Sequence, residues 1–295
     1  MFINYVKIQG SEGKLIMQIN KKELLKPKYD IVFQALFGGN KENITQSFIS
    51  DILGKPVEII DIKTDDTIMI EYPNDKAGRL DLKTRFKDGT ICQIEMQLTD
   101  QGNTIKRLLY YWSRTYSKQL QSGETYNNLN KTIGIIITNY ELEELKGLEE
   151  LDTNWKIMET RRGKRVLTED LEFYIIELSK AEKVLQKDKY NRLAQWLLFL
   201  DNPNTERVEE IMKENEEVKK AQSVLHEMSD DEKLQRLAEL REKWDIDERS
   251  ALSSAREEGE QKAKYEIAKK LKKLNVEIAN IEKATGLAKE EIERL

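Results

Sequence analysis

Hydrophobic and polar residues alternate with a period of two in residues 79–86 and again in residues 90–98. Successive side chains of a strand point to opposite faces of a sheet, so this alternation predicts two strands that each have one apolar face. Asp88-Gly89 stands between them, and this dipeptide is a strong signal for a tight hairpin turn. The two segments are therefore predicted to pair as an antiparallel hairpin.

Helical and strand patterns continue on both sides of this hairpin. A continuous apolar run at residues 133–138 is typical of a buried central strand, and residues 104–121 have the pattern of a long helix. Asp30 can cap the helix that we expect at residues 29–37. Together these segments predict an α/β domain with a mixed sheet flanked by helices. Further elements are expected at residues 42–53 (a helix) and at residues 57–62, 67–71 and 172–178 (strands).

Glycine and proline become rare after residue 180. A segment without these residues and rich in Glu, Lys, Leu and Ala favours helix. We therefore expect an all-α C-terminal region at residues 181–295, with charges of both signs interleaved. It follows an α/β domain at residues 28–180 and an N-terminal extension at residues 1–27. Within the extension, either Met1 or Met17 can be the native start.

The chain ends in a helix-turn-helix-like segment, with its turn at Thr285-Gly286. The second helix carries Glu290, Glu291 and Glu293, and acidic residues are poor for entering the major groove of DNA. This favours a role in protein–protein assembly over DNA reading. The charged C-terminal helices are also one route to a homo-oligomer.

Composition restricts the chemistry. The chain has one cysteine, Cys92, which fits a reducing compartment, and one histidine, His226. A Ser-His-Asp triad and a histidine-rich metal site are therefore nearly excluded. No run of about 18 apolar residues occurs, so we expect a cytoplasmic protein without a membrane segment. The net charge of −5 gives no bulk attraction to nucleic acid, although local basic patches can still bind it.

Candidate chemistry lies on the polar face of the predicted hairpin, where Asp81 and Lys83 stand on one strand and Glu95 and Gln97 on the next. Two carboxylates on neighbouring strands can hold a divalent cation, and the backbone carbonyl of Met96 offers a further oxygen ligand. The expected ion is Mg²⁺, with Mn²⁺ or Ca²⁺ as alternatives. Such an ion activates water for attack on a phosphodiester, and Lys83 or Gln97 would orient that water. The alternative is a hairpin face that is polar only because it contacts water.

Asp81 followed by Glu95-x-Gln97 on the next strand resembles the D…(D/E)xK signature of PD-(D/E)XK nucleases. Other segments match in the same order: Asp30-Ile-Val-Phe33-Gln-Ala-Leu-Phe37-Gly38, Arg79-Leu80-Asp81, Ile94-Glu95-Met96-Gln97, Arg107-Leu-Leu-Tyr110-Tyr111-Trp-Ser113-Arg114 and Gln119-Leu-Gln-Ser-Gly123-Glu-Thr-Tyr126. Over residues 28–180 the chain resembles the transposase-like branch of that superfamily, the recombination-promoting nucleases of bacteria.

The resemblance implies a restriction-endonuclease-like fold and metal-dependent DNA cleavage, with Asp81 and Glu95 as metal ligands. Gln97 stands where the wider superfamily has lysine. A neutral amide cannot supply the positive charge of that lysine, which leaves Lys83 as a substitute. In related nucleases an acid of the first helix reaches the metals, so Asp30 is either a further metal ligand or a helix cap.

Arg107, Tyr111 and Arg114 recur at i, i+4 and i+7 in the predicted helix after the hairpin, so they share a face. Either the two arginines bind DNA phosphates with Tyr111 beside them, or they are solvated while Tyr110 and Trp112 pack into the core.

These observations predict a Mg²⁺-dependent DNA endonuclease linked to recombination, mobile elements or defence. The alternative is a weak or inactive nuclease-fold protein that serves as a DNA-binding or assembly module. A third hypothesis is a toxin-like or defence nuclease held inactive by its own C-terminal region.

Overall fold

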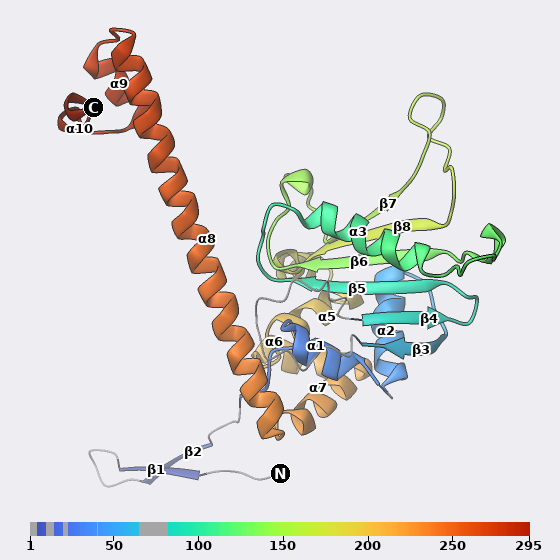
Figure 1. Cartoon of the computed structure of the whole chain (residues 1–295). Coiled ribbons are helices and arrows are strands. Elements are labelled where there is room, and N and C mark those ends of the chain that lie inside the picture. Colours follow the sequence, from blue (N-terminus) through green and yellow to red (C-terminus); the bar gives the residue numbers. More distant parts are fainter. Residues whose placement is uncertain (1–4, 10–14, 20–22, 40, 65–81) are drawn as a thin grey trace. The chain divides into compact units, whose positions relative to one another are not determined.

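Figure 1 shows the computed structural model of the chain, which describes residues 5–9, 15–19, 23–39, 41–64 and 82–295. The chain forms two compact units, Met1–Glu242 and Lys243–Leu295, and each is described by itself.

The first unit is built on a six-stranded mixed sheet with the strand order β3-β4-β5-β6-β8-β7. Strands β5, β6 and β8 run parallel in its centre, and the outer strands pair antiparallel. Every residue of β6 is buried, as expected for a central strand with a continuous apolar run. The predicted mixed sheet is therefore confirmed. Its strands are β3 (Ile59–Lys63), β4 (Leu82–Phe86), β5 (Ile91–Gln97), β6 (Thr132–Thr138), β7 (Asp152–Lys156) and β8 (Leu171–Glu177).

Strand β7 was not predicted from the sequence. Its residues Asp-Thr-Asn-Trp-Lys are mostly polar and lie at the edge of the sheet, so no hydrophobic period marks them. A separate antiparallel pair, β1 (Tyr5–Gln9) and β2 (Leu15–Ile19), lies in the segment predicted as an extension. The strand predicted at residues 67–71 falls outside the described residues.

Strands β4 and β5 form the predicted hairpin around Asp88-Gly89. Gly89 has a φ of +89°, and a Cβ built there would lie 2.5 Å from the side chain of Asn130. The positive φ therefore favours glycine at this turn, and any larger residue would also have to displace the side chain of Asn130. The register of the hairpin pairs Lys83 with Gln93, so these two side chains share a face of the sheet.

Helices cover both faces of the sheet (Figure 1). On one face lies α3 (Thr104–Ser117), whose Leu108 packs with Phe173 and other apolar residues of the sheet. On the other face lie α1 (Asp30–Phe37) and α2 (Glu42–Leu53), which pack in the main core of the unit. The prediction of helices on both faces is confirmed, and α2 has the predicted bounds.

Helices that follow the sheet in sequence complete this main core. Trp196 of α5 is fully buried, with its ring centroid 6.1 Å from that of Phe37 and 5.5 Å from that of Phe48. Its indole Nε1 donates to Oδ2 of Asp51 at 2.9 Å. The sheet and the following helices therefore share one core. These helices are α4 (Ala181–Lys187), α5 (Arg192–Asp201), α6 (Glu206–Glu214) and α7 (Glu216–Met228).

Helix α8 (Glu232–Lys273) leads into the second unit, where α9 (Ile278–Thr285) and α10 (Lys289–Arg294) follow it. A small cluster of Ala268, Ile281, Leu287 and Ile292 holds this unit together. Gly286 ends α9 with a φ of +72°, at the predicted turn. Among the described helices, including α8, none is long and apolar enough to cross a lipid bilayer.

Candidate active site

Three buried polar side chains, Gln93, Glu95 and Gln97, form a polar row on one face of β5. They are 1%, 3% and 8% exposed, whereas Ile94 and Met96 alternate with them and pack into the core on the opposite face. Burying a polar group costs free energy unless hydrogen bonds replace those to water. The alternative of a solvated hairpin face is therefore wrong for this strand.

Glu95 is the acid of the polar row, and only one of its carboxylate oxygens has a described hydrogen-bond partner. Oε1 accepts from Nη2 of Arg107 on α3, whereas Oε2 is buried without a partner. Burial raises the pKa of Glu95, and the charge and hydrogen bond of Arg107 offset this rise only in part. A buried carboxylate with one unpaired oxygen is suited to bind a cation or a proton.

Gln97 and Met96 occupy the end of β5. The amide Nε2 of Gln97 donates to the backbone oxygen of Thr99 at 3.0 Å, and no described contact joins this amide to Glu95. Met96, whose backbone carbonyl was predicted as a metal ligand, pairs with Ile137 in the ladder between β5 and β6. The amide of Gln97 therefore stabilises the local chain rather than the Glu95 carboxylate.

Lys83 is half-buried on the same face of the sheet as the polar row, opposite Gln93. Burial lowers the pKa of Lys83, and the nearby charges of Arg85, Lys63 and Lys118 lower it further. We call these four residues the cationic cluster. The alternation along β4 indicates Arg85 from sequence, but Lys63 and Lys118 come from β3 and from the end of α3, which sequence spacing does not connect to Lys83.

The comparisons with known proteins agree with this architecture. The model of the PD-(D/E)XK nuclease family transposase matches residues 27–255. The chain belongs to this family. No curated protein and no solved structure matches the chain. The matched segment continues past residue 180, so it includes α4–α7 as well as the sheet.

Nucleases of the PD-(D/E)XK family generally use divalent metal ions, and the family implies a DNA substrate. Asp81, the other acid of the family signature, lies outside the described residues. Within the described part of the chain, no group of three or more His, Cys, Asp and Glu side chains could hold a metal ion. Of the two acids of the signature, the structure therefore describes the surroundings of Glu95.

Asp30 is not brought to the polar row. It is the first residue of α1, which packs on the opposite face of the sheet from Glu95. Its carboxylate pairs with Arg241 of α8, whose Nε donates at 2.7 Å. The prediction that Asp30 caps the helix is wrong, because Tyr29 occupies that position. A structural ion pair accounts for the carboxylate of Asp30.

The three predicted nucleic-acid contacts of α3 separate into two environments. Arg107 and Tyr111 belong to the site: Arg107 pairs with Glu95, and its guanidinium carbon lies 5.7 Å from the centroid of the Tyr111 ring. Arg114 is exposed. The alternative that Tyr110 packs into the core is wrong, since Tyr110 is 59% exposed.

Gln93 is a residue of the site to which the sequence assigned no chemistry. Neither amide atom of its buried side chain has a hydrogen-bond partner in the described structure. Its place two residues before Glu95 on a period-two strand was the available signal. A buried amide without partners beside a buried acid indicates a site that takes further polar groups, such as water or a ligand.

Proposed function

We propose that this chain is a divalent-metal-dependent DNA endonuclease whose metal is held at Glu95. The observation that carries the proposal is Oε2 of Glu95, which is buried on the polar row at the position of the family's second acid and has no hydrogen-bond partner among the described residues. Natural proteins rarely leave such an oxygen unpaired without a role for it.

The residues present fit a hard divalent cation. Glu95 offers a carboxylate oxygen, and no histidine or cysteine accompanies it in the polar row, so Mg²⁺ is the proposed ion, with Mn²⁺ or Ca²⁺ as alternatives. Asp81 is proposed as the second acid on the basis of its place in the sequence. It directly precedes Leu82, whose partner across the hairpin is Ile94, the neighbour of Glu95. The backbone carbonyl of Met96 remains a proposed third ligand.

A metal bound there would activate water for attack on a phosphodiester and neutralise developing charge. The chain's own residues prepare the site in two ways. Arg107 binds Oε1 of Glu95, and within the described part of the chain no group binds Oε2. Lys83 supplies a half-buried cation on the same face, which fits the role that lysine of the signature has elsewhere in the family. The biological context proposed is recombination, mobile elements or defence.

The test is plasmid cleavage by purified protein with Mg²⁺, comparing Glu95→Gln with Glu172→Gln. Glu172 is another buried acid, on β8 two strands away, and serves as the control. Cleavage by Glu95→Gln should fall at least about 100-fold, because metal activation contributes several kcal/mol and each ~1.4 kcal/mol is a factor of ten. Glu172→Gln should cleave like the unmodified protein. Equal activity of all three proteins, or cleavage that persists in EDTA, would show the proposal to be wrong.

A second candidate function is a DNA-binding or assembly module that cleaves weakly. The observation in its favour is that Gln97 stands where the signature has lysine, and its amide nitrogen donates to the backbone oxygen of Thr99. For this candidate the assembly partner would be a second copy bound through the C-terminal helices. Metal-dependent cleavage that is lost in Glu95→Gln decides against it, whereas DNA binding without cleavage decides for it.

A further inference from the structure

The hairpin between β7 and β8 carries a concentration of positive charge at its tip. Arg161, Arg162, Lys164 and Arg165 are all exposed, and none of them has an ion-pair partner among the described residues. We call these four residues the basic tip. Cations nearer the sheet behave differently, since Lys156 lies 2.8 Å from Oε2 of Glu169. The four cations of the tip are therefore without ion pairs in the described structure, on a chain whose net charge is −5.

The basic tip has a defined backbone. The carboxylate of Glu159 accepts from the backbone N–H of Arg161 at 2.6 Å and from that of Arg162. Across the hairpin, the N–H of Glu159 donates to the oxygen of Arg165 at 2.8 Å. Glu159, the acid nearest the tip, thus satisfies backbone groups instead of pairing with a guanidinium. The arrangement fixes the backbone of the tip, and no ion pair in the described structure occupies its four cations.

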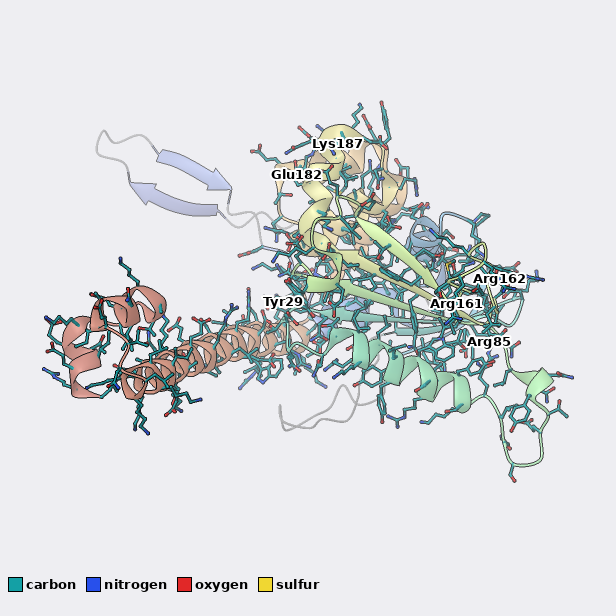
Figure 2. The ribbon with its side chains drawn as sticks, turned by 90° about the horizontal axis from the view of Figure 1, so that it is seen from above. Tyr29, Arg85, Arg161, Arg162, Glu182 and Lys187 are labelled. Carbon is teal, nitrogen blue, oxygen red and sulfur yellow. The ribbon has the colours of Figure 1, made fainter. Side chains whose placement is uncertain are left out.

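The basic tip also lies at the same end of the sheet as Arg85 of the cationic cluster. Figure 2 labels Arg85, Arg161 and Arg162 at this end. Figure 1 shows the β4–β5 turn and the connection between β7 and β8 at the same end of the sheet. Positive charge thus occurs at two places at one end of the sheet, near the end of β4 and on the β7–β8 connection. Such an array attracts a polyanion that is longer than either place alone.

We propose that the basic tip binds the phosphate backbone of DNA outside the site of cleavage. Arginine presents a planar fork of donors that suits phosphate oxygens, and three of the four residues are arginine. The choice of DNA as the polyanion rests on the proposed nuclease function. Contacts to the backbone carry no base information, so the tip would hold and orient DNA without selecting a sequence.

The distribution of apolar residues favours DNA over an anionic membrane. The large exposed apolar side chains of this hairpin lie on its strands and stem rather than in the basic tip; they are Trp155, Ile157, Met158 and Leu167. Membrane-inserting segments place their apolar side chains in the lipid and their cations at its surface. In this hairpin the cations lie at the tip and the apolar side chains lie behind them, which is the opposite of the arrangement in a membrane-inserting segment.

The experiment measures binding of a fluorescent 30-base-pair duplex by anisotropy in EDTA, with cleavage thereby suppressed. The variant carries Arg161→Gln, Arg162→Gln, Lys164→Gln and Arg165→Gln. The matched control removes four exposed cations elsewhere in the first unit, by Lys55→Gln, Lys213→Gln, Lys233→Gln and Arg236→Gln. Both sets change the net charge by the same amount, so a general electrostatic effect would weaken both equally.

We expect the tip variant to bind DNA at least about 30-fold more weakly and the control less than about 3-fold more weakly. The slope of log affinity against log salt should fall by about 2 to 4 in the tip variant, since each phosphate contact contributes about 0.9. Equal effects in the two variants, or an unchanged salt slope, would overturn the proposal. So would tip-dependent binding to phosphatidylserine vesicles with DNA binding unaltered.

Failure of the nuclease proposal can be told apart from failure of this one. If Glu95→Gln leaves cleavage unchanged but the tip variant loses DNA binding, the basic tip stands and the catalytic assignment falls. If Glu95→Gln abolishes cleavage but the tip variant binds normally, the reverse holds.

Discussion

Two buried carboxylates of the same sheet, Glu95 on β5 and Glu172 on β8, have opposite environments. Both are nearly inaccessible to water, at 3% and 6% exposure. Burial would raise the pKa of Glu172, but hydrogen bonds from Lys131, Asn154 and Tyr174 outweigh it, and the pKa lies below its usual value. Among the described residues only Arg107 pairs with Glu95, and the pKa of Glu95 is raised by burial.

The difference separates a structural acid from a candidate functional one. A carboxylate that maintains a fold is surrounded by enough donors to compensate for its burial. Glu172 meets this condition, with its Oε1 accepting from Nδ2 of Asn154 at 2.8 Å and from the hydroxyl of Tyr174 at 3.0 Å. Glu95 does not meet it, so its burial costs stability that the fold alone does not require.

The largest effect on stability is expected from replacing Arg107, the described partner of Glu95. Arg107→Met should lower the free energy of unfolding by about 2 to 4 kcal/mol at pH 7, because a buried carboxylate would lose its only described counter-charge. Divalent metal should recover part of the loss, since it would replace that charge. Urea unfolding with and without Mg²⁺ measures both effects.

Arg114→Met is the control for the same helix. Arg114 is exposed, so its replacement should change the free energy of unfolding by less than about 0.5 kcal/mol and leave its response to Mg²⁺ unaltered. Equal destabilisation by the two variants would mean that Arg107 contributes no more to the fold than a surface arginine does.

A smaller effect is expected in the pH dependence of stability, where the two acids should differ in sign. Hydrogen bonds lower the pKa of Glu172 in the folded chain, so its contribution to stability is present above the ordinary glutamate pKa and is lost as the pH falls through the folded pKa. Burial raises the pKa of Glu95, so stability falls as the pH rises from the ordinary glutamate pKa through the folded pKa.

Urea unfolding between about pH 3 and about pH 8 covers both titrations and checks this difference. Relative to the unmodified protein, Glu172→Gln should become less stable as the pH rises, and Glu95→Gln should become relatively more stable. A trend of the same sign in both variants would remove the physical distinction between the two carboxylates.

Sequence periodicity could predict the strands and which residues of a strand share a face of the sheet. It could not predict which helix packs on each face. The alternation in β5 placed Glu95 and Gln97 together on a polar face, and the Asp88-Gly89 turn set the hairpin. The ion pair of Glu95 with Arg107 depends on how α3 packs across the sheet, which no local pattern encodes. For the same reason the sequence suggested an exposed hairpin face where the structure has a buried one.

Strand β7 and the basic tip show a second limit of sequence reasoning. An edge strand buries little, so selection for a hydrophobic period is weak and the pattern is absent. The charges of residues 161–165 are plain in the sequence. Their significance depends on the shape of the turn, in which Glu159 accepts from backbone N–H groups rather than from a guanidinium, and this is a property of the fold.

The smallest effect on stability is expected from two glutamines, Gln119 and Gln93. Like the two acids, one has its hydrogen bonds satisfied and the other does not. Gln119 is satisfied: its Nε2 donates to the hydroxyl of Thr132 at 2.9 Å, and its Oε1 accepts from the backbone N–H of Asn130 at 2.9 Å. Gln93 is buried with both amide atoms unpaired in the described structure. Replacing an unsatisfied buried amide by an apolar side chain of similar size removes a desolvation cost.

Gln93→Met should therefore raise the free energy of unfolding by about 1 kcal/mol in metal-free protein, and Gln119→Met should lower it by about 1 to 2 kcal/mol. Urea unfolding of the two variants in EDTA gives both values. If Gln93→Met is destabilising instead, its amide has a partner in solution, and the polar row is already satisfied without a ligand. If Gln93→Met stabilises the fold but lowers cleavage, the amide of Gln93 lowers stability and serves the site. Such an exchange of stability for function is expected of a residue that binds a ligand.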